Sequence, residues 1–318
     1  MEGLGAELLR LTDGTLRAAV PLVLAVLAGL LARRAGVVDF ALEGRMLAGA
    51  FAAAAAAQLS GSAWAGLVAA LGASATLALL QACAPLRTRG EQLAVGMAIN
   101  VVAAGLTPTL ARAWFSDPER LSVLTPEARF GPLGLPGAEA PAAVPMLGPL
   151  LRDLISGQRP FFYFTLLAVP AVVLLMERTR FGLRLRAAGE KPLAAAAAGL
   201  SVSRLRSEAL VLGGMLTGIA GADLALAQYA GFARELTAGR GYLALAALAL
   251  ARWRPGPGLA LCLLVAFADV LETRLRGVPL AETITVANET LRVFPYLLLV
   301  LLFAVAVGRE ASPRSPER

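Results

Sequence analysis

The chain has no histidine, one lysine and two cysteines among its 318 residues. Cys83 and Cys262 are isolated thiols in apolar segments, so a disulfide framework, a zinc site and a histidine-dependent catalytic triad are all excluded. Lys191 lies outside any Gly-x-x-x-x-Gly-Lys-Ser/Thr phosphate loop. We therefore expect no catalytic residues, no metal and no bound cofactor, and any ATP that drives the protein must be hydrolysed by another chain.

Charged residues are also scarce. They make up 16% of the chain, against about 25% in soluble domains, while 58% of the residues are hydrophobic and the mean hydropathy is +0.70. This composition indicates an integral membrane protein. The formal charge of +7 comes almost entirely from arginines in the loops between apolar segments. Arginines in such loops are topology signals and headgroup contacts, so we expect no nucleic-acid partner.

The apolar segments predict an all-α polytopic transmembrane bundle of about nine spans, with eight to ten allowed. The chain is expected to form a single transmembrane domain over residues 1–318. Several segments are shorter than the roughly 20 residues of a straight span, so broken or re-entrant elements are expected, especially around 238–251. The nine segments are 16–32, 38–58, 64–85, 92–111, 161–176, 208–229, 238–251, 257–271 and 293–308.

The Arg-rich stretch 177–207 is the longest polar interruption, and the positive-inside tendency places it in the cytoplasm. Alternation from it puts the N-terminus outside and makes four further segments cytoplasmic, namely 33–36, 86–91, 252–256 and the tail from Arg309. The outside segment 112–160 is rich in proline and glycine, which predicts an irregular external loop. It either caps the outer mouth or is inert.

A short helix is predicted within 177–207. Pro192 can begin it, Leu193 to Ala198 are helix formers, and Gly199 can end it in a left-handed conformation. Ser201 or Ser203 can cap the next helix. A short helix held between two spans can dock into a groove on a soluble partner, although a solvated loop at the lipid headgroups has the same charge pattern.

The residue order of this loop resembles the coupling loop of ABC importer permeases, in particular those of the branched-chain amino acid, ribose and nucleoside group. Lys191 departs from the pattern, where an uncharged polar residue such as Asn is expected. The resemblance implies that the loop enters a cleft of the ATP-hydrolysing subunit. The matching residues are Arg186, Gly189, Glu190, Pro192, Ala195, Ala196 and Gly199.

Two further stretches resemble this family. Residues 36–44 are similar to its Gly-Val-Val-Asn-x-x-Leu-Glu-Gly pattern, with Asp39 in place of Asn, and residues 92–100 are similar to its fourth span. Asp39 and Glu43 are expected to share a helical face. A charge at the bilayer centre costs about 2.5–3.5 kcal/mol, so these carboxylates should line a cavity, pair, or lie near the interface.

Uncharged and acidic residues complete the candidate substrate pathway. Gln92 and Asn100 suit a neutral, hydroxyl-rich solute, and hydrogen bonds between helices explain them equally well. Asp223 is the acid most deeply placed in an apolar segment, whereas Asp269 and Glu272 lie near the outer end of a span, where they can be solvated. The turns at 239–242 and 252–255 resemble the family's Gly-Arg-Gly-Phe and Gly-Trp-Arg-Pro turns.

Small residues predict the helix contacts. A Gly-x-x-x-Gly spacing joins Gly214 and Gly218, and a second small-residue face lies in the third span. Such faces let helices approach closely in lipid. The residues of the second face are Ala65, Gly66, Ala69, Ala70, Gly72 and Ala73.

Together, the resemblance implies a multi-pass permease of the bacterial plasma membrane that moves nucleosides by alternating access. It implies three protein partners besides the lipid bilayer: a separate ATPase that uses ATP and Mg²⁺, a second homologous permease, and an external substrate-binding lipoprotein. Ribose or another simple sugar is the alternative substrate. A different class, a proton-coupled transporter or intramembrane enzyme, would use Asp39, Glu43, Asp223 and Asp269 as proton or metal carriers.

Overall fold

The computed structural model describes residues 2–84, 88–115, 123–134, 156–275, 296–302 and 304, and regular structure in these residues is helical. The predicted all-α fold is confirmed. The α-helices are α1 (Glu2–Arg34), α2 (Leu42–Ser60), α3 (Ala63–Cys83), α4 (Arg89–Trp114), α6 (Pro160–Arg178), α7 (Arg180–Glu190), α8 (Pro192–Ala197), α9 (Val202–Asp223), α10 (Arg240–Leu250) and α11 (Pro255–Leu275). A 3₁₀ turn, η2 (Pro126–Ala128), and a π-helical turn, η4 (Leu224–Gln228), complete the elements.

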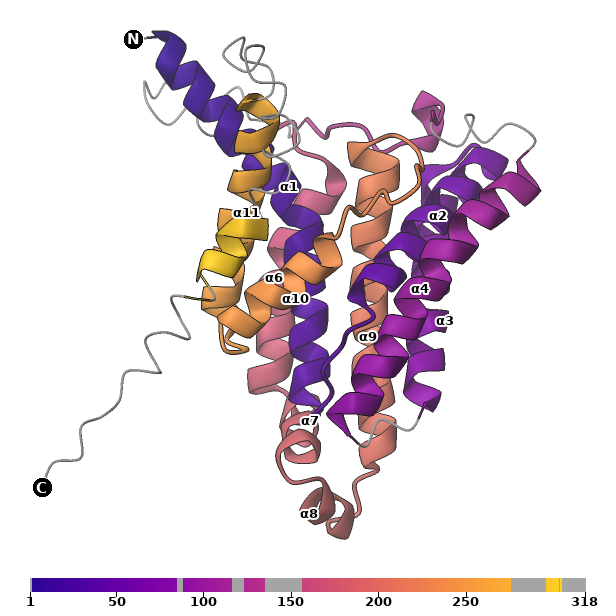
Figure 1. The fold of residues 1–318 in the computed structure, drawn as a ribbon, viewed down its shortest axis with the longest axis vertical. Helices are drawn as coiled ribbons and strands as arrows, with labels where there is room; N and C mark the ends of the chain where they lie inside the picture. Colours follow the sequence, from indigo (N-terminus) through magenta and orange to yellow (C-terminus); the bar gives the residue numbers. More distant parts are fainter. Residues whose placement is uncertain are drawn as a thin grey trace, which may run out of the picture.

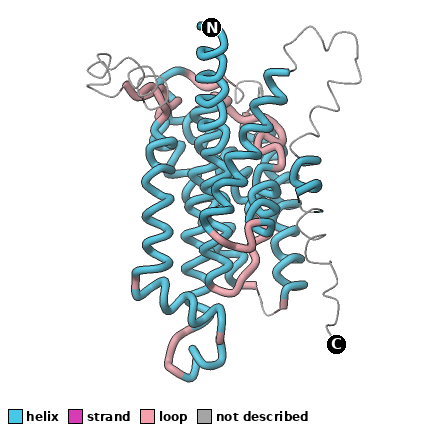
Figure 2. The backbone as a smooth tube through the Cα atoms, turned by 90° about the vertical axis from the view of Figure 1, so that its left-hand side faces the viewer, coloured by secondary structure: helices cyan, strands magenta, loops and turns pink. Residues whose placement is uncertain are grey.

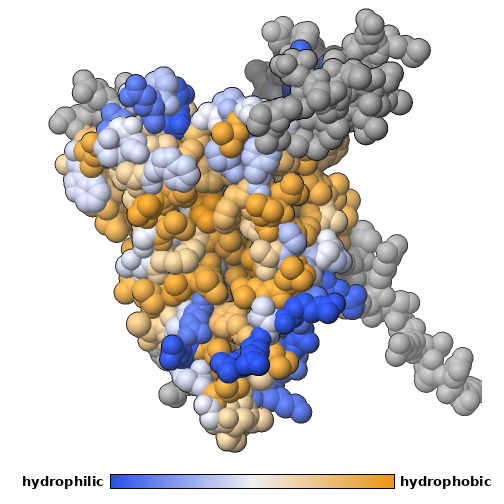
Figure 3. Space-filling model, turned by 180° about the vertical axis from the view of Figure 1, so that it is seen from behind, coloured by the Kyte–Doolittle hydropathy of each residue, from blue (hydrophilic) through white to orange (hydrophobic). Residues whose placement is uncertain are grey.

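Within the described residues, five helices are long and apolar enough to cross a membrane. They are Glu7–Arg34, Ala63–Cys83, Gly90–Trp114, Pro160–Arg178 and Val202–Gln228. Figure 3 shows an apolar belt across the middle of one face, with hydrophilic residues gathered toward its ends. This distribution is that of a polytopic membrane bundle.

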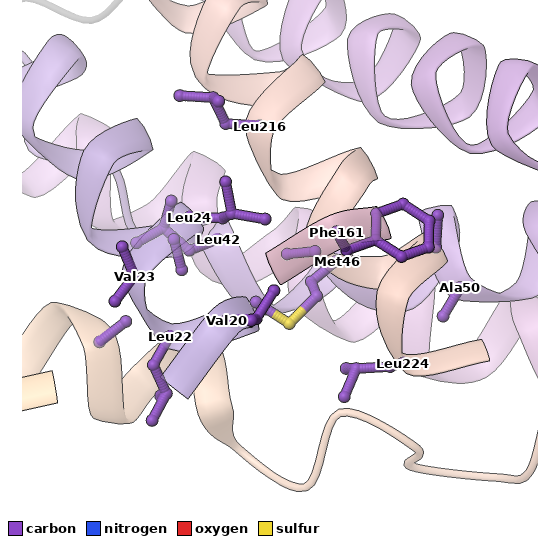
Figure 4. Packing of buried hydrophobic residues seen from close by; sticks show 14 of the residues in the cluster. Val20, Leu22, Val23, Leu24, Leu42, Met46, Ala50, Phe161, Leu216 and Leu224 are labelled. Carbon is purple, nitrogen blue, oxygen red and sulfur yellow. The ribbon is translucent and has the colours of Figure 1, made fainter. Parts of the chain in front are cut away.

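Helices α1 and α9 form the centre of the bundle. The most apolar stretches of these two helices are 83% and 78% buried, against 28% in α3, α4 and α6, which therefore lie at the periphery. Helix α2 packs against α3, α4 and α9, and α1 packs against α6, α9, α10 and α11 (Figure 1). Figure 2 shows the bundle from the side, with its long helices running lengthwise. Figure 4 shows the apolar core where α1, α2 and α9 meet, around Leu24, Met46 and Leu216.

The two ends of the bundle differ. Helices α7 and α8 project from one end, and the N-terminus and η2 lie at the other (Figure 1). The turns after α1 and α10 lie at the α8 end, where the guanidinium of Arg33 stacks 5.1 Å from the ring centroid of Trp253. The predicted grouping of segments 33–36, 177–207 and 252–256 at one end thus agrees with the fold.

The boundaries of several elements differ from the sequence prediction. Helix α1 begins at Glu2 rather than at residue 16, and helix α2 begins at Leu42 rather than at residue 38, because residues 37–41 are not helical. Helix α9 begins at Val202, and η4 continues it to Gln228. The expected short element near 238–251 is α10, which has 11 residues.

Parts of several predicted segments lie outside the described residues. They are most of the external loop 112–160, part of the segment 86–91, half of the last span 293–308, and the tail from Arg309. The described part of the external loop lies over the top of α9, where the Leu124 N–H donates to the Ala230 carbonyl (2.9 Å) and the Phe130 N–H donates to the Leu226 carbonyl (3.0 Å).

The predicted close contacts are confirmed at Gly66, Gly214 and Gly218, and Gly72 is an exception. An added Cβ at Gly214 or Gly218 would lie 2.9 Å from the Ser74 carbonyl or 2.8 Å from the Ala70 carbonyl, so both glycines are needed for close approach. Gly66 does the same against the Ala53 carbonyl (2.6 Å). Gly72 is the exception, because a Cβ there would meet no atom within 4 Å.

Two glycine substitutions that should change the stability of the protein in opposite directions test this packing. In Gly221→Ala, the new Cβ would lie 2.6 Å from the Ala50 nitrogen of α2, so we expect a loss of stability of about 1–3 kcal/mol. In Gly72→Ala, the Cβ points into open space, and the better helix propensity should stabilise the protein by about 0.5–1 kcal/mol. Thermal unfolding of each purified variant in detergent measures the change in stability. Equal melting temperatures for the two variants would contradict the packing described here.

Candidate functional site

The first candidate feature is the hairpin formed by α7 and α8. The Thr179 hydroxyl caps α7 by accepting from the Gly182 N–H (3.1 Å). Pro192 begins α8, and Gly199 follows it with φ +81°. The predicted short helix and its left-handed stop are thus confirmed, and Ser201 caps α9 by accepting from the Arg204 N–H (3.4 Å). Helix α7 was missed, because the charge density of its sequence masked its amphipathic spacing.

The tip of the hairpin presents a small apolar surface. Leu193 is 88% exposed, the highest value among the exposed large hydrophobic residues. On α8 itself, Ala195 is buried, while Pro192 and Ala196 are exposed. An exposed apolar helix with one anchoring residue is suited to insertion into a groove of another protein.

The base of the hairpin rests on the turn after α1. A Cβ at Gly189 would overlap the Arg34 carbonyl and lie 2.9 Å from the Gly36 nitrogen, so the two backbones touch without an intervening side chain. The Arg206 Nε donates to the Ala35 carbonyl at 3.3 Å. A small apolar cluster closes this contact, formed by Ala35, Leu185, Ala188, Leu205 and Ala209.

The two remaining predicted loop residues lie on opposite sides of this contact. Arg186 is half-buried, and its Nε has no hydrogen-bond partner in the described part of the chain. Glu190 is exposed at the end of α7. The hairpin therefore has an open tip and a tightly packed base.

The second candidate feature is the break between α1 and α2, whose backbone is bonded to two amide side chains of α4. The Val38 N–H donates to Gln92 Oε1, and the Gly44 N–H donates to Asn100 Oδ1, both at 2.8 Å. Asn100 Nδ2 in turn donates to the Phe40 carbonyl (2.8 Å). Gln92 and Asn100 are both 4% exposed. Their amide groups thus satisfy the backbone that the break leaves unpaired.

Asp39 and Arg45 form an ion pair in which both side chains are 0% exposed. The Gln81 Nε2 and the Ala41 N–H also donate to the Asp39 carboxylate, each at 3.2 Å. Arg45 Nη1 donates to the Leu210 carbonyl of α9 at 3.2 Å. The expectation that Asp39 shares a helical face with Glu43 is wrong, because Asp39 precedes the helix in non-helical backbone. Of the expected alternatives Asp39 is paired, and its burial shows that it is not solvated.

Glu43 caps the N-terminus of α10. Its carboxylate accepts from the Thr237 hydroxyl (2.5 Å), the Gly239 N–H (2.9 Å) and the Gly241 N–H (2.6 Å). The first N–H groups of a helix have no partner within the helix, and a carboxylate there also complements the helix dipole. The side chain that the sequence marked as a pathway candidate is therefore fully bonded to α10.

Asp223 lies apart from the break. It is 2% exposed and accepts from Gln228 Nε2 at 2.6 Å, and it follows Leu210 by 13 residues of α9, a rise of about 20 Å. Arg159 faces it from the start of α6. Burial lowers the pKa of the Arg159 guanidinium, and the charge of Asp223 opposes that change. Four of the pathway candidates thus gather at the break, and the fifth lies near the other end.

A further polar group was not predicted. Arg240 Nη2 donates to the Asp269 carboxylate at 3.1 Å and to the Tyr229 hydroxyl at 3.0 Å. Asp269 is paired and its side chain remains 37% exposed, as expected for a solvated acid. Glu272 is only 5% exposed, which corrects the expectation that it is solvated. Gly239 and Gly241 flank Arg240, and this Gly-Arg-Gly turn is the sequence feature that could have marked Arg240 as a functional candidate. Within the described residues, no group of three or more acidic or cysteine side chains could hold a metal ion.

Comparison with known proteins places these features in a family. The family model described as "Branched-chain amino acid transport system / permease component" matches residues 11–303. The guanosine ABC transporter permease protein NupQ of Bacillus subtilis is 30% identical, over 96% of this chain and 94% of the relative.

Two other relatives extend the comparison. The putative glucose ABC transporter permease protein TsgC13 of Haloferax volcanii is 30% identical, over 96% of this chain and 93% of its own. The nucleoside ABC transporter permease protein NupC of Lactococcus lactis is 28% identical, over 93% of this chain and 91% of its own. No solved structure matches significantly.

The ion pair of the break gives a stability prediction. Asp39→Ala would leave the Arg45 guanidinium buried without its counter-ion, and we expect a loss of about 3–5 kcal/mol. The double variant Asp39→Leu/Arg45→Met should recover most of that loss, because it removes both charges. Thermal unfolding in detergent measures each variant.

A matched control is the ion pair between Arg204 and Glu208, whose side chains are 79% and 40% exposed. Glu208→Ala should change stability by less than about 1 kcal/mol. If Asp39→Ala were as mild as Glu208→Ala, the buried pair would not hold the break.

Proposed function

The chain belongs to the family of permease components of branched-chain amino acid transport systems, and from this premise we propose that it imports nucleosides. It is the membrane component of an ABC importer and not its catalytic subunit, so ATP is used by a separate ATPase. An ABC permease of this family implies two kinds of partner, an ATPase and a substrate-binding protein. The assembly proposed here adds a second homologous permease and a lipid-anchored external binding protein.

The observation that carries the proposal is the unbroken chain of contacts from the hairpin to α10. The exposed tip of α8 enters a cleft of the ATPase, and residues 177–207 lie in the cytoplasm. The backbone contact of Gly189 with Gly36 joins the hairpin to the break. After the break, the Gly44 N–H is bonded to Asn100 of α4, and the Glu43 carboxylate is bonded to the start of α10.

Alternating access follows from this connection. When ATP binding closes the ATPase, the hairpin moves and displaces the break with it, because no flexible side chain separates the two backbones. Helices α4 and α10 are hydrogen-bonded to the break and move with it. The two permeases then open the solute path to one side of the membrane at a time.

Two of the relatives named above are transporters of nucleosides, one of them of guanosine, and this supports nucleosides as the substrate class. A simple sugar is the second candidate, supported by the relative named for glucose, which is equally identical to this chain. Both solutes are neutral and rich in hydroxyl groups, so hydrogen-bonding residues alone do not separate them.

Uptake in a strain that lacks only this gene tests the substrate class. Labelled guanosine, uridine and ribose are supplied separately while cellular ATP is monitored. Loss of nucleoside uptake alone, restored by the gene on a plasmid, is the expected result. Loss of ribose uptake alone would show that the substrate is a sugar rather than a nucleoside. Unchanged uptake of all three solutes would refute the proposal that this chain imports them.

Gly199 and Gly61 form a matched pair for testing the hairpin. Both have positive φ (+81° and +68°), and neither has an atom within 4 Å of an added Cβ. Valine at either position therefore costs the same kind of backbone strain, about 1–2 kcal/mol. Gly199 ends α8, whereas Gly61 ends α2 at the opposite end of the bundle.

We expect Gly199→Val to reduce uptake at least tenfold and to abolish stimulation of the ATPase, while the protein still inserts in the membrane. Gly61→Val should retain most of the uptake. Proteoliposomes containing the complete importer allow both activities to be measured together. Equal effects of the two variants would show that strain alone, and not the hairpin, limits transport.

A further inference from the structure

Three of the four tyrosines of the chain lie at the N-terminus of α10. Tyr229 ends η4, Tyr242 lies in the first turn of α10, and Tyr296 packs beside Gly239, where an added Cβ would come within 2.9 Å of its hydroxyl. These positions are more than fifty residues apart in sequence at their extremes. Their gathering at one point is a property of the fold.

The polar ends of these tyrosines are held, and the rings remain partly exposed. The Tyr229 hydroxyl accepts from Arg240 (3.0 Å), and the Tyr296 hydroxyl donates to the Ala238 carbonyl (2.8 Å). Tyr242 lies beside Glu43 and Asn100. The exposed fractions are 50% for Tyr229, 41% for Tyr242 and 42% for Tyr296. Because the hydroxyl end of each ring is fixed, the rings present an oriented aromatic surface. They lose little further conformational entropy when a ligand binds.

Arg240 supplies an unused hydrogen-bond donor at the same place. The residue is 8% exposed, and its Nη2 makes the bonds to Tyr229 and Asp269. Its Nη1 is buried and has no hydrogen-bond partner within the described part of the chain. A buried donor of a charged group without a partner is costly and rare in native proteins. A ligand acceptor at this position would remove that cost.

The backbone that leads into α10 is also irregular. Residues 229–239 are not helical, and they run from the outer end of η4 down to the start of α10 (Figure 1). Three non-glycine residues of this segment, Ala230, Glu235 and Ala238, have positive φ. Non-helical backbone at membrane depth is tolerated where it is covered by protein or lines a water-filled path, and not where it faces lipid.

We propose that Tyr229, Tyr242, Tyr296 and Arg240 form the solute-contact surface of this permease, on which the base of a nucleoside stacks. This inference rests on the proposed function and names the site of that substrate. The base lies against the tyrosine rings. Arg240 Nη1, which is enclosed in this structure, turns toward the bound base and donates to an acceptor such as a ring nitrogen or carbonyl oxygen. The second permease covers the outer side of the base.

The pairing of an aromatic surface with a charged donor and a carboxylate favours a base over a simple sugar. A base has two flat π-faces, and its edge carries both acceptors and donors. Arg240 meets the acceptors and Asp269, 37% exposed in its side chain, meets the donors. The residues at the break have no free role in this contact, because Asp39, Glu43 and Asn100 are bonded within the protein.

The test uses the complete importer in proteoliposomes, with labelled guanosine, uridine and ribose. The measured quantity is the amount of solute imported per ATP hydrolysed. Stacking on an aromatic side chain contributes about 1–3 kcal/mol per base, so Tyr229→Leu and Tyr242→Leu should each lower this ratio for nucleosides roughly tenfold, while stimulated ATP hydrolysis continues. Tyr229→Phe keeps the ring and should stay within about threefold of the wild type.

Tyr163→Leu is the matched control, because Tyr163 is the fourth tyrosine and lies on α6, with its ring 5.6 Å from that of Phe162. It should leave the ratio unchanged. Wild-type ratios in Tyr229→Leu and Tyr242→Leu would refute the contact surface and leave nucleoside import intact. Import of ribose but not nucleosides by the wild type would instead refute the proposed substrate.

A second measurement does not depend on folding of the leucine variants. Wild-type importer is photolabelled with an azido-guanosine during turnover, and the modified peptides are identified by mass spectrometry. Labelling of the peptide containing residues 229–242, suppressed by excess guanosine, is the expected result. Labelling confined to other spans would overturn the assignment.

Discussion

Backbone hydrogen bonding inside the bundle is the constraint on which this structure depends. A lipid bilayer offers no water to an unpaired N–H or carbonyl group, so an interrupted helix needs partners from its neighbours. Two such interruptions lie in the described part of the chain, residues 37–41 before α2 and residues 229–239 before α10. Gln92 and Asn100 bond to the first, and Glu43, the second residue of α2, bonds to the second. The two interruptions are therefore connected to each other through α2.

Close backbone contacts join the same region to the hairpin. Gly36 meets Gly189, Gly44 fits against Asn100, and Gly241 fits against Glu43, and each contact would be blocked by a single added carbon. Glycine thus allows helices α2, α4, α7 and α10 to meet at the break without flexible side chains between them. Contacts of this kind transmit displacement, because close-packed atoms have little space in which to absorb it. The buried pair of Asp39 and Arg45 adds directional bonds to α3 and α9 at the same place.

The sequence predicted the parts of this arrangement that are local. Pro192 and Gly199 mark α8 because their backbone preferences act within a few residues, and long apolar runs mark the spans. The sequence could not predict the partners of Glu43 or Asp39, since a carboxylate is compatible with a cavity, an ion pair or a helix cap. The choice depends on whether residues 237–241 and Arg45 lie nearby, which is a property of the tertiary fold. The start of α2 was misplaced for the same reason, because Gln92 and Asn100 stabilise a non-helical segment whose own residues allow helix.

This explains why the polar residues most conspicuous in the sequence differ from those best placed to meet a solute. A charged or amide side chain in an apolar segment costs free energy unless it is paired or hydrogen-bonded. In a folded protein such a side chain therefore bonds first to groups of the protein itself, including unpaired backbone groups. Solute contacts then come from residues that tolerate partial exposure. Tyrosine is such a residue, because its hydroxyl can be fixed to the protein while its ring faces the path. Arg240 joins them through a donor that the protein leaves unused. In this fold, the break and the contact surface are adjacent because both exist only where helices are interrupted.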